Sequence, residues 1–363
     1  MYLYLIYIVF AVFSFIEING GRLISKRLLF VPFLCLFFLS CLRWERGTDW
    51  NSYLSLFEEA HNAFYLLAFE PGFYYLNLFV KINTDNYTIL LMVEAFIIYA
   101  LHFYVIKRYS ISPMVSVLIW FGFYMGSIFF VRFHIALAIT LFSFIYIMDR
   151  KFWKFLICIF IATLFHRTAF LFIPAYFIYT KNFSRLQLLF GVGISFCLSA
   201  LFKLGLDLLG GINLGTFSEK ALVYSESDAQ DFGISSPFRI MLIGATYRVL
   251  IILLIIRYFY TLYKENNTFK GLLNLYFVGV CLFIVITPVS IPMARMAQYY
   301  EYIQLLIVPY IILNFRHLPI RNLVFIMITL FYLMRLKSNI GAYEDLFIPY
   351  KSIFNKDMPV EIG

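Results

Sequence analysis

The sequence predicts an all-α, polytopic integral membrane protein with about twelve transmembrane helices. Of its 363 residues, 63% are hydrophobic and only 13% are charged, whereas soluble domains carry roughly 25% charged residues. Apolar runs of roughly 17 to 25 residues recur along the whole chain, and each can cross a hydrocarbon core about 30 Å thick as a helix. These observations exclude a soluble enzyme, a secreted disulfide scaffold and a nucleic-acid-binding protein, although the formal net charge is +9.

The first apolar run is expected to be a retained span, because residues 1–15 lack both a positively charged start and a small-residue cleavage site. Apolar residues 64–82 are interrupted by Glu70, Pro71 and Gly72, so we expect an interfacial or half-buried segment there. The pair of runs around His166 and Arg167 could be two short helices or one broken, re-entrant element. Windows of about 19 residues place the predicted spans at 2–16, 28–42, 88–106, 113–131, 134–148, 153–166, 168–180, 186–204, 240–262, 271–289, 297–314 and 319–334.

Basic residues predict the orientation. With the N-terminus outside, 15 of the 29 Lys and Arg residues fall in cytoplasmic turns that hold only three acids, among them Glu17. This asymmetry follows the positive-inside rule and explains the basic composition without an acidic partner. The larger hydrophilic segments then face outward as loops at 43–87 and 205–239 and a tail at 335–363. We expect a single membrane domain over residues 1–363.

The sequence gives no sign of a metal or a cofactor. The five cysteines lie in or beside apolar runs, without a C-x-x-C pair or a histidine at ligand spacing, and are expected to be packing residues. There is no D-x-D triplet, and no His, Asp and Glu cluster has metal-ligand spacing. We therefore expect the site to use side chains alone.

Polar groups near the outer membrane boundary are the candidate site residues, because a charge at membrane depth is costly and usually functional. Arg43 and Arg46 could share a helical face or grip two oxygens of one phosphate, with the Asp49 carboxylate beside them. An interfacial anchor of Arg and Trp is the alternative. Glu70 lies at a Pro-initiated turn, where a helix N-cap is the alternative to a functional carboxylate.

Two further candidates lie at predicted helix ends. Arg132 falls between two spans, where it either holds an anion or extends to the interface. His166 could act as a general base near neutral pH, with Arg167 beside it, or could be structural. Both stretches are predicted to reach the outer face.

Three more candidates come from the second half of the chain. Arg239 and Arg248 lie on opposite faces of one span, and Arg248 either faces a cavity or pairs with Glu94 or another buried acid. Arg295 and Tyr299 are one helical turn apart and predict a polar, aromatic stripe, for which an interfacial tyrosine belt is the alternative.

The predicted topology brings arginines from separate stretches to one membrane boundary. Fixed cations at that depth suit a lipid-linked pyrophosphate, whose leaving group arginines can stabilise as charge develops. Arginine would then take the place of a divalent metal. The six arginines are Arg43, Arg46, Arg132, Arg167, Arg239 and Arg295.

These residues resemble those of the EpsG/Wzy-type polysaccharide polymerases over nearly the whole chain. The more specific motifs are R-G-T-D-x-x-x-Y at 46–53 and E-P-G-F at 70–73. Phe133 and His134 depart from the pattern, since a Gln is expected at one of them. The remaining motif residues occur in order: Arg132 with Ala136 and Ile139, His166-Arg167-Thr168-Ala169, Arg295 with Tyr299, and Pro349-Tyr350.

The resemblance implies a GT-C-like membrane glycosyltransferase architecture and the activity of an O-antigen polymerase. Such an enzyme transfers a growing glycan from undecaprenyl pyrophosphate to the next lipid-linked repeat unit, on the periplasmic face of the bacterial inner membrane. Its partners would be the lipid-linked oligosaccharide, membrane lipid, and the chain-length regulator and flippase of the same pathway, but no nucleic acid.

Site roles follow from that reaction as hypotheses. Arg43, Arg46, Arg132, Arg167, Arg248, Arg295 and Tyr299 would bind pyrophosphate or sugar. Asp49 or His166 would take the acceptor proton, and Glu70 would orient the sugar or replace the base.

Other classes remain open at this stage. A lipid-linked-oligosaccharide ligase or another polyprenyl-dependent transferase would use the same groups. A flippase would need cations through the membrane midplane, where only Arg248 and Glu94 are candidates. A sugar O-acyltransferase would need a histidine facing a cytoplasmic acyl donor, whereas His166 is predicted on the outer side.

Overall fold

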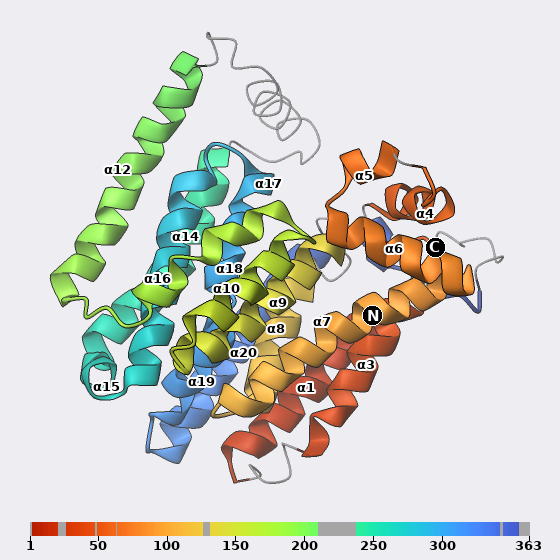
Figure 1. Ribbon diagram of the computed structural model, residues 1–363. Helices are drawn as coiled ribbons and strands as arrows, with labels where there is room; N and C mark the ends of the chain where they lie inside the picture. The colour runs from red at the N-terminus through yellow and green to blue at the C-terminus, as the bar shows by residue number, and fades with distance from the viewer. Residues whose placement is uncertain are drawn as a thin grey trace. The chain divides into compact units, whose positions relative to one another are not determined.

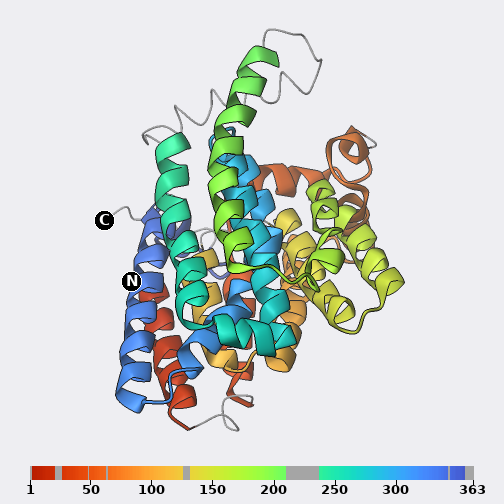
Figure 2. The same cartoon turned by 90° about the vertical axis from the view of Figure 1, so that its left-hand side faces the viewer.

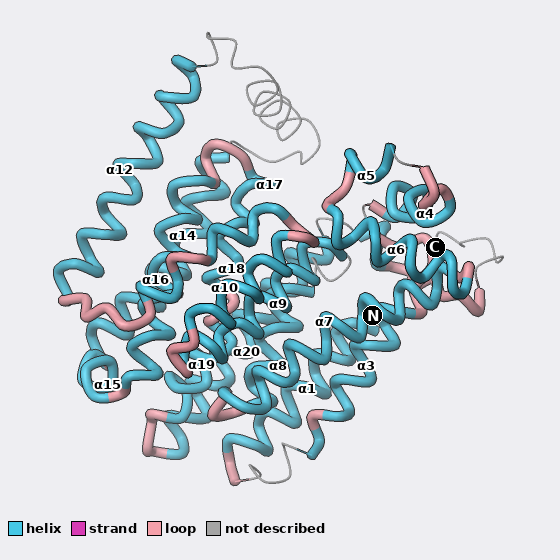
Figure 3. Tube along the Cα trace, viewed as in Figure 1, coloured by secondary structure: helices cyan, strands magenta, loops and turns pink. Residues whose placement is uncertain are grey.

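The computed structural model describes residues 2–20, 27–47, 49–62, 64–125, 131–209, 237–341 and 344–355. Within these ranges the chain consists of helices and loops without a strand (Figure 3), and one isolated β-bridge pairs Arg43 with Ser352. The predicted all-α class is therefore confirmed. Parts of the predicted loops, at 48, 210–236 and 356–363, lie outside the described residues, as do the basic residues Arg22 and Lys26.

Helices suited to a membrane dominate the described chain. Five are long and apolar enough to cross one: α7 (Tyr87–Tyr109), α9 (Val131–Met148), α14 (Pro237–Tyr258), α16 (Asn267–Ile286) and α20 (Leu318–Gly341). Shorter apolar helices accompany them at Tyr2–Ile18, Phe30–Cys41, Pro113–Tyr124, Phe152–Thr163, Arg167–Ile178, Arg185–Leu201 and Gln304–Leu313. The protein is a membrane protein, while the count of about twelve spans and the GT-C-like architecture stay predictions.

Several helix boundaries differ from the prediction, and three of them matter here. α9 begins at Val131, so Arg132 lies in its first turn and not in a loop between spans. α20 extends to Gly341, beyond the predicted end at 334, because Leu336 and Ile340 continue its buried stripe at i, i+4 spacing. The run predicted as one span at 297–314 is interrupted, with α18 (Gln298–Glu301) and α19 (Gln304–Leu313) separated by a turn.

The described chain divides into two compact units, the first formed by Met1–Phe170 with Val308–Gly363 and the second by Leu171–Ile307. In unit 1, α9 packs against α7 and against α10 (Phe152–Thr163), and α3 (Phe30–Cys41) packs along α7. α8 (Pro113–Tyr124) packs against both α1 (Tyr2–Ile18) and α20, and Figures 1 and 2 show the red α1 beside the blue α20. The expectation of a single domain stays a prediction.

A buried carboxylate fixes the start of α8. Glu17 is 1% exposed and accepts hydrogen bonds from the Ser112 hydroxyl and, at 2.9 Å, from the Met114 backbone N–H. Negative charge at a helix N-terminus satisfies its free N–H groups and the helix dipole. Glu17, counted above among the acids of a cytoplasmic turn, is therefore a buried helix cap.

Unit 2 is organised around α16. α12 (Arg185–Leu209) and α14 pack against it, and so do α15 (Tyr260–Glu265) and the short helices α17 (Ile291–Ala294) and α18. Buried Asn274 on α16 donates to the backbone oxygens of Ile178, Tyr179 and Lys181 at 3.2, 3.3 and 2.7 Å. These bonds hold the end of α11 (Ala175–Ile178) and the loop after it.

Candidate functional site

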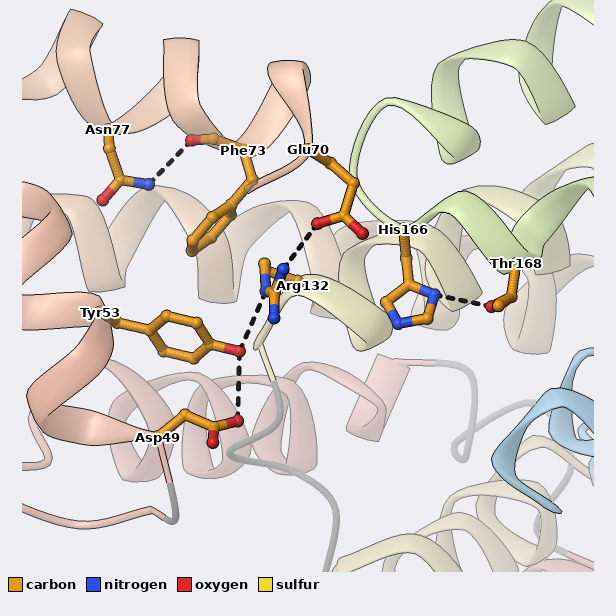
Figure 4. A network of polar contacts seen from close by, with 8 residues as sticks. All are labelled: Asp49, Tyr53, Glu70, Phe73, Asn77, Arg132, His166 and Thr168. Atoms are coloured by element: carbon orange, nitrogen blue, oxygen red, sulfur yellow. Dashed lines mark hydrogen bonds and ion pairs between the residues drawn. The ribbon is translucent and has the colours of Figure 1, made fainter. Parts of the chain in front are cut away.

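A chain of polar contacts in unit 1 centres on Arg132 (Figure 4). Its Nη1 donates to Glu70 Oε2 at 2.6 Å, and its Nε donates to the Tyr53 hydroxyl at 3.3 Å. The Tyr53 hydroxyl in turn donates to Asp49 Oδ2 at 3.3 Å. The structure thus brings Asp49, Glu70 and Arg132, three of the residues predicted from sequence, into one network.

Short helices in the predicted loop at 43–87 position the acidic members. Asp49 is the N-cap residue of α4 (Trp50–Glu58), so Tyr53 lies one helical turn further along the same face. Glu70 is the N-cap residue of α6 (Pro71–Thr84), and its extended backbone suits a residue that precedes proline. Its side chain makes no cap hydrogen bond, because the carboxylate is directed to Arg132 instead.

Aromatic rings surround the Arg132 guanidinium. Its Cζ lies 4.8 Å from the ring centroid of Phe69, 5.6 Å from that of Tyr53 and 6.0 Å from that of Phe73. The Tyr53 and Phe73 rings also pack against each other, with centroids 5.3 Å apart. A planar guanidinium is attracted to aromatic faces, so these rings hold Arg132 in place without using its N–H groups.

His166 approaches the network through neighbouring residues. Its ring lies 5.2 Å from that of Phe133, the residue after Arg132, and its Nδ1 is 2.6 Å from the Thr168 hydroxyl. The Gly72 backbone N–H donates to Leu164 O at 2.8 Å, which joins α6 to the end of α10. Figure 4 shows His166 next to the Glu70–Arg132 pair. The E-P-G-F motif at 70–73 and the His166-Arg167-Thr168-Ala169 motif therefore contribute to one candidate site.

Gly72 permits this close approach. A Cβ at this position would lie 2.8 Å from both the backbone oxygen and the Cβ of Leu164, closer than real Cβ atoms come to other atoms. The glycine of the E-P-G-F motif is thus needed so that the backbone of α6 can reach α10. Glu70, two residues earlier, depends on that contact for its position.

The network is buried but not closed. The Arg132 side chain is 27% exposed and that of Glu70 is 11% exposed. Among the described residues, Arg132 Nη2 and Glu70 Oε1 have no hydrogen-bond partner. Burial raises the pKa of Tyr53 to about 12, an effect that the nearby Arg132 opposes. Tyr53 is therefore a neutral hydroxyl near pH 7, and it can accept from Arg132 and donate to Asp49 at once.

Arg43 and Arg46 do not share a helical face, because residues 43–47 are not helical. Arg43 is buried, with Nη1 at 3.5 Å from Ser40 O. Arg46 is 9% exposed, and its Nη1 donates to Asp345 O at 3.3 Å. Its buried Nε and Nη2 have no hydrogen-bond partner among the described residues. This edge of a guanidinium is one that can bind a carboxylate or a phosphate through two hydrogen bonds.

The C-terminal segment holds this stretch in place. The Trp44 N–H donates to Lys351 O at 2.9 Å, and the Ile353 N–H donates to Leu42 O at 3.0 Å. Tyr350, of the predicted Pro-Tyr motif, donates its hydroxyl to Leu39 O at 2.9 Å. The described part of the predicted tail is thus packed against the arginine-bearing loop.

Arg248 in unit 2 has a different environment. Its Nε and Nη2 donate to the two carboxylate oxygens of Glu301 at 2.5 and 2.8 Å, and its Nη1 donates to Gly244 O at 2.8 Å. The side chains are 7% and 1% exposed. The alternative of pairing with a buried acid is therefore observed, with Glu301 as the acid in place of Glu94. Because every guanidinium nitrogen has a protein partner, we leave Arg248 out of the proposed site.

The structure places the remaining candidates outside the Arg132 network. Arg167 and Arg239 are exposed, Arg295 is half-buried and Tyr299 is buried. Arg295 belongs to the 3₁₀ segment Arg295–Ala297 and Tyr299 to α18, which follows it directly, and the polar, aromatic stripe stays a prediction. The convergence of all six arginines on one membrane boundary stays a prediction.

Sequence reasoning missed three residues that contact the candidate arginines: two beside Arg132 and one that pairs with Arg248. Tyr53 was known only as a motif residue, although its i, i+4 spacing from Asp49 could have indicated a contact. Phe69 precedes the E-P-G-F motif and carries no distinguishing signal. Glu301 follows a pair of tyrosines in an apolar run, where a lone acid predicts a buried partner but does not identify it.

Comparison with known proteins adds the family. No curated protein and no solved structure matches the chain. The model of the EpsG family matches residues 26–352, which includes every residue of the unit 1 network. That family supports a membrane polysaccharide polymerase-like role, and the chain belongs to the EpsG family.

Proposed function

We propose that this protein is an O-antigen polymerase of the bacterial inner membrane. It would join oligosaccharide repeat units carried on undecaprenyl pyrophosphate, on the periplasmic face, with the pyrophosphate lipid as leaving group. Family membership and the apolar helices support the general role. The observation that carries the specific reaction is the Arg132 guanidinium, which aromatic rings and Glu70 hold while the side chain stays 27% exposed and Nη2 has no partner among the described residues.

The leaving group determines what the site must supply. As the bond between the anomeric carbon and the pyrophosphate oxygen breaks, that oxygen gains negative charge, and fixed guanidinium groups stabilise it. Arg132 and Arg46, whose buried Nε and Nη2 have no partner among the described residues, are the donors in unit 1 that fit this role. Arg43, Arg167, Arg295 and Tyr299 stay sequence-based candidates for additional phosphate or sugar contacts.

The acceptor hydroxyl attacks the anomeric carbon and loses its proton. Asp49 or His166 would take that proton, and both lie within the network or next to it. Thr168 positions the His166 ring through Nδ1, which directs Nε2 away from this bond. Glu70, paired with Arg132, would orient a sugar hydroxyl through Oε1. The half-buried Phe69 ring would offer an apolar face for a sugar ring.

Gel analysis of surface lipopolysaccharide tests the proposed function. A strain lacking the gene should lose the long ladder and keep the single-repeat band, and restoring the gene should bring the ladder back. Loss of the single-repeat band as well would indicate flipping or ligation, and an unchanged ladder would contradict polymerisation.

A matched pair of variants sharpens the test. Arg132→Gln should fail to restore the ladder at normal protein levels, because the pyrophosphate loses the guanidinium charge and its Nη2 donor. Arg257→Gln is the control, since Arg257 is exposed at the end of α14 and lies outside the network. Equal ladders from both variants would remove Arg132 from the mechanism.

A further inference from the structure

A pocket lies in unit 1, outside the proposed site. It has a volume of about 500 Å³ and lies between the start of α3 and the end of α7. Its walls combine basic and aromatic side chains, namely Arg27, Leu29, Phe30, Phe33, Ala100, Phe103, Tyr104 and Lys107. Ligand pockets fall in this size range, so a lipid headgroup with part of an acyl chain fits it.

This pocket and the polar network lie at opposite ends of α7. At one end, Tyr87 packs against Trp50 of α4, with ring centroids 5.2 Å apart. Near the other end, Phe103 packs against Phe33 at 5.5 Å. α7 has 23 residues and is therefore about 35 Å long at 1.5 Å per residue. That length is enough to cross a bilayer core about 30 Å thick, so the pocket belongs to the opposite membrane face.

Two cations mark the rim of the pocket. Arg27 precedes α3 and Lys107 belongs to the last turn of α7, and both are exposed. Neither forms an ion pair with an acid in the part of the chain that the structure describes. Arg108, the neighbouring cation, is already engaged, because its Nη1 donates to the Tyr104 hydroxyl at 3.3 Å and its guanidinium lies 5.5 Å from the Tyr109 ring centroid. Arg27 and Lys107 are thus the cations at the pocket whose N–H groups can donate hydrogen bonds to a ligand.

The remaining walls are apolar. Phe30 and Tyr104 are exposed although they are large and hydrophobic, and Phe33 and Phe103 line the groove between them. Cations at the rim above an aromatic groove fit an amphiphile with one anionic headgroup and an acyl chain. Basic pockets between transmembrane helices bind acidic lipid headgroups in this way.

We propose that this pocket binds an acidic phospholipid, with its phosphate on Arg27 and Lys107 and an acyl chain against Phe30, Phe33 and Phe103. The occupant is a lipid of the membrane face opposite the polar network. The lipid would hold α3 and α7 together at that face. The opposite end of each helix lies near the proposed site. This binding does not depend on the proposed polymerase activity.

Lipid titration of the purified, full-length protein in detergent tests the proposal by native mass spectrometry. Dioleoyl-phosphatidylglycerol should bind roughly tenfold more tightly than dioleoyl-phosphatidylcholine, which has the same chains and no net charge. Glycerol phosphate, which has the headgroup without chains, should bind more weakly than either lipid. The double variant Arg27→Gln with Lys107→Gln should lose the preference for phosphatidylglycerol.

A control variant removes the same charge elsewhere. Lys154→Gln with Arg257→Gln also removes two exposed cations, and it should keep the preference. Melting temperatures without lipid check that both variants are folded. Equal binding of the two lipids to the wild type, or an equal loss in the control, would overturn the proposal. Tight binding of glycerol phosphate alone would replace the lipid with a soluble phosphate.

Discussion

Two Arg–Glu pairs of this protein differ in how completely the protein uses the guanidinium. Arg248 and Glu301 form two hydrogen bonds through Nε and Nη2, and their side chains are 7% and 1% exposed. Arg132 and Glu70 form one at 2.6 Å, and their side chains are 27% and 11% exposed. The first pair leaves no guanidinium nitrogen without a protein partner, whereas the second keeps donor and acceptor atoms for a ligand.

The comparison shows that a charge in an apolar run is not enough to define a site. In the Arg248–Glu301 pair, which we call the closed pair, two buried charges neutralise each other, and its geometry resists rearrangement. In the Arg132–Glu70 pair, which we call the open pair, the arginine is held in one orientation and can still bind an anion. By this criterion Arg132 belongs to the proposed site and Arg248 supports the fold of unit 2.

The largest predicted effect concerns Arg132. Arg132→Lys keeps the positive charge but loses the planar fork, so we expect polymer synthesis to fall roughly a hundredfold at unchanged protein level. Quantification of ladder bands against single-repeat lipopolysaccharide measures this change. Activity within a factor of two of the wild type would show that Arg132 acts only as a point charge.

The closed pair should affect folding and not chemistry. Arg248→Ala leaves Glu301 buried and unpaired, which should destabilise the protein by about 3–5 kcal/mol and reduce its amount in the membrane. Arg248→Met together with Glu301→Leu replaces both charges with apolar groups and should restore the protein level and the ladder. Membrane immunoblots and gels provide the two readouts. A stable but inactive double variant would return Arg248 to the site.

A smaller effect is expected where α6 meets α10. Gly72→Ala places a Cβ 2.8 Å from Leu164 O, so α6 must shift and move Glu70 away from Arg132. We expect polymer yield to fall roughly tenfold, since small displacements of positioned groups slow catalysis. Gly193→Ala is the matched control, because its Cβ would meet no atom within 4 Å. Equal yields from both variants would show that Glu70 does not depend on this contact.

The smallest effect concerns Tyr53. Its hydrogen bonds to Arg132 and Asp49 are both 3.3 Å long, so Tyr53→Phe should reduce activity by roughly two- to tenfold. Burial raises the Tyr53 pKa to about 12, so the hydroxyl stays protonated below that pH. The pH profile of Tyr53→Phe between pH 6 and 9 should therefore have the same shape as that of the wild type. A changed shape would mean that Tyr53 itself titrates during turnover.

Sequence patterns could predict the membrane class and part of the site. Apolar length predicts helices that cross a membrane because the hydrocarbon core demands internally satisfied backbone, and the structure bears this out. Asp49, Glu70, Arg132 and His166 were selected as costly polar groups beside apolar runs, and the structure gathers them. The physical reason is that such groups need partners, and in this chain they find one another.

The remaining features depend on tertiary contacts that periodicity does not encode. The pairing of Arg248 with Glu301 joins residues 53 positions apart, and an apolar pattern does not specify which acid meets which base. The C-terminal segment, expected as a tail, pairs with Leu42 and Trp44 through backbone hydrogen bonds that any sequence could form. Because α9 begins at Val131, Arg132 lies within a helix. The helix tolerates this arginine because Glu70 pairs with it and aromatic rings pack around it.

The most direct test of the central claim measures the leaving group. Purified protein in liposomes is supplied with undecaprenyl-pyrophosphate-linked repeat units as the only substrate, and released undecaprenyl pyrophosphate is quantified together with glycan length. The wild type should release one pyrophosphate lipid for each unit joined, and Arg132→Lys should release almost none. Glycan extension without pyrophosphate lipid release, or release at wild-type rates from Arg132→Lys, would contradict the account.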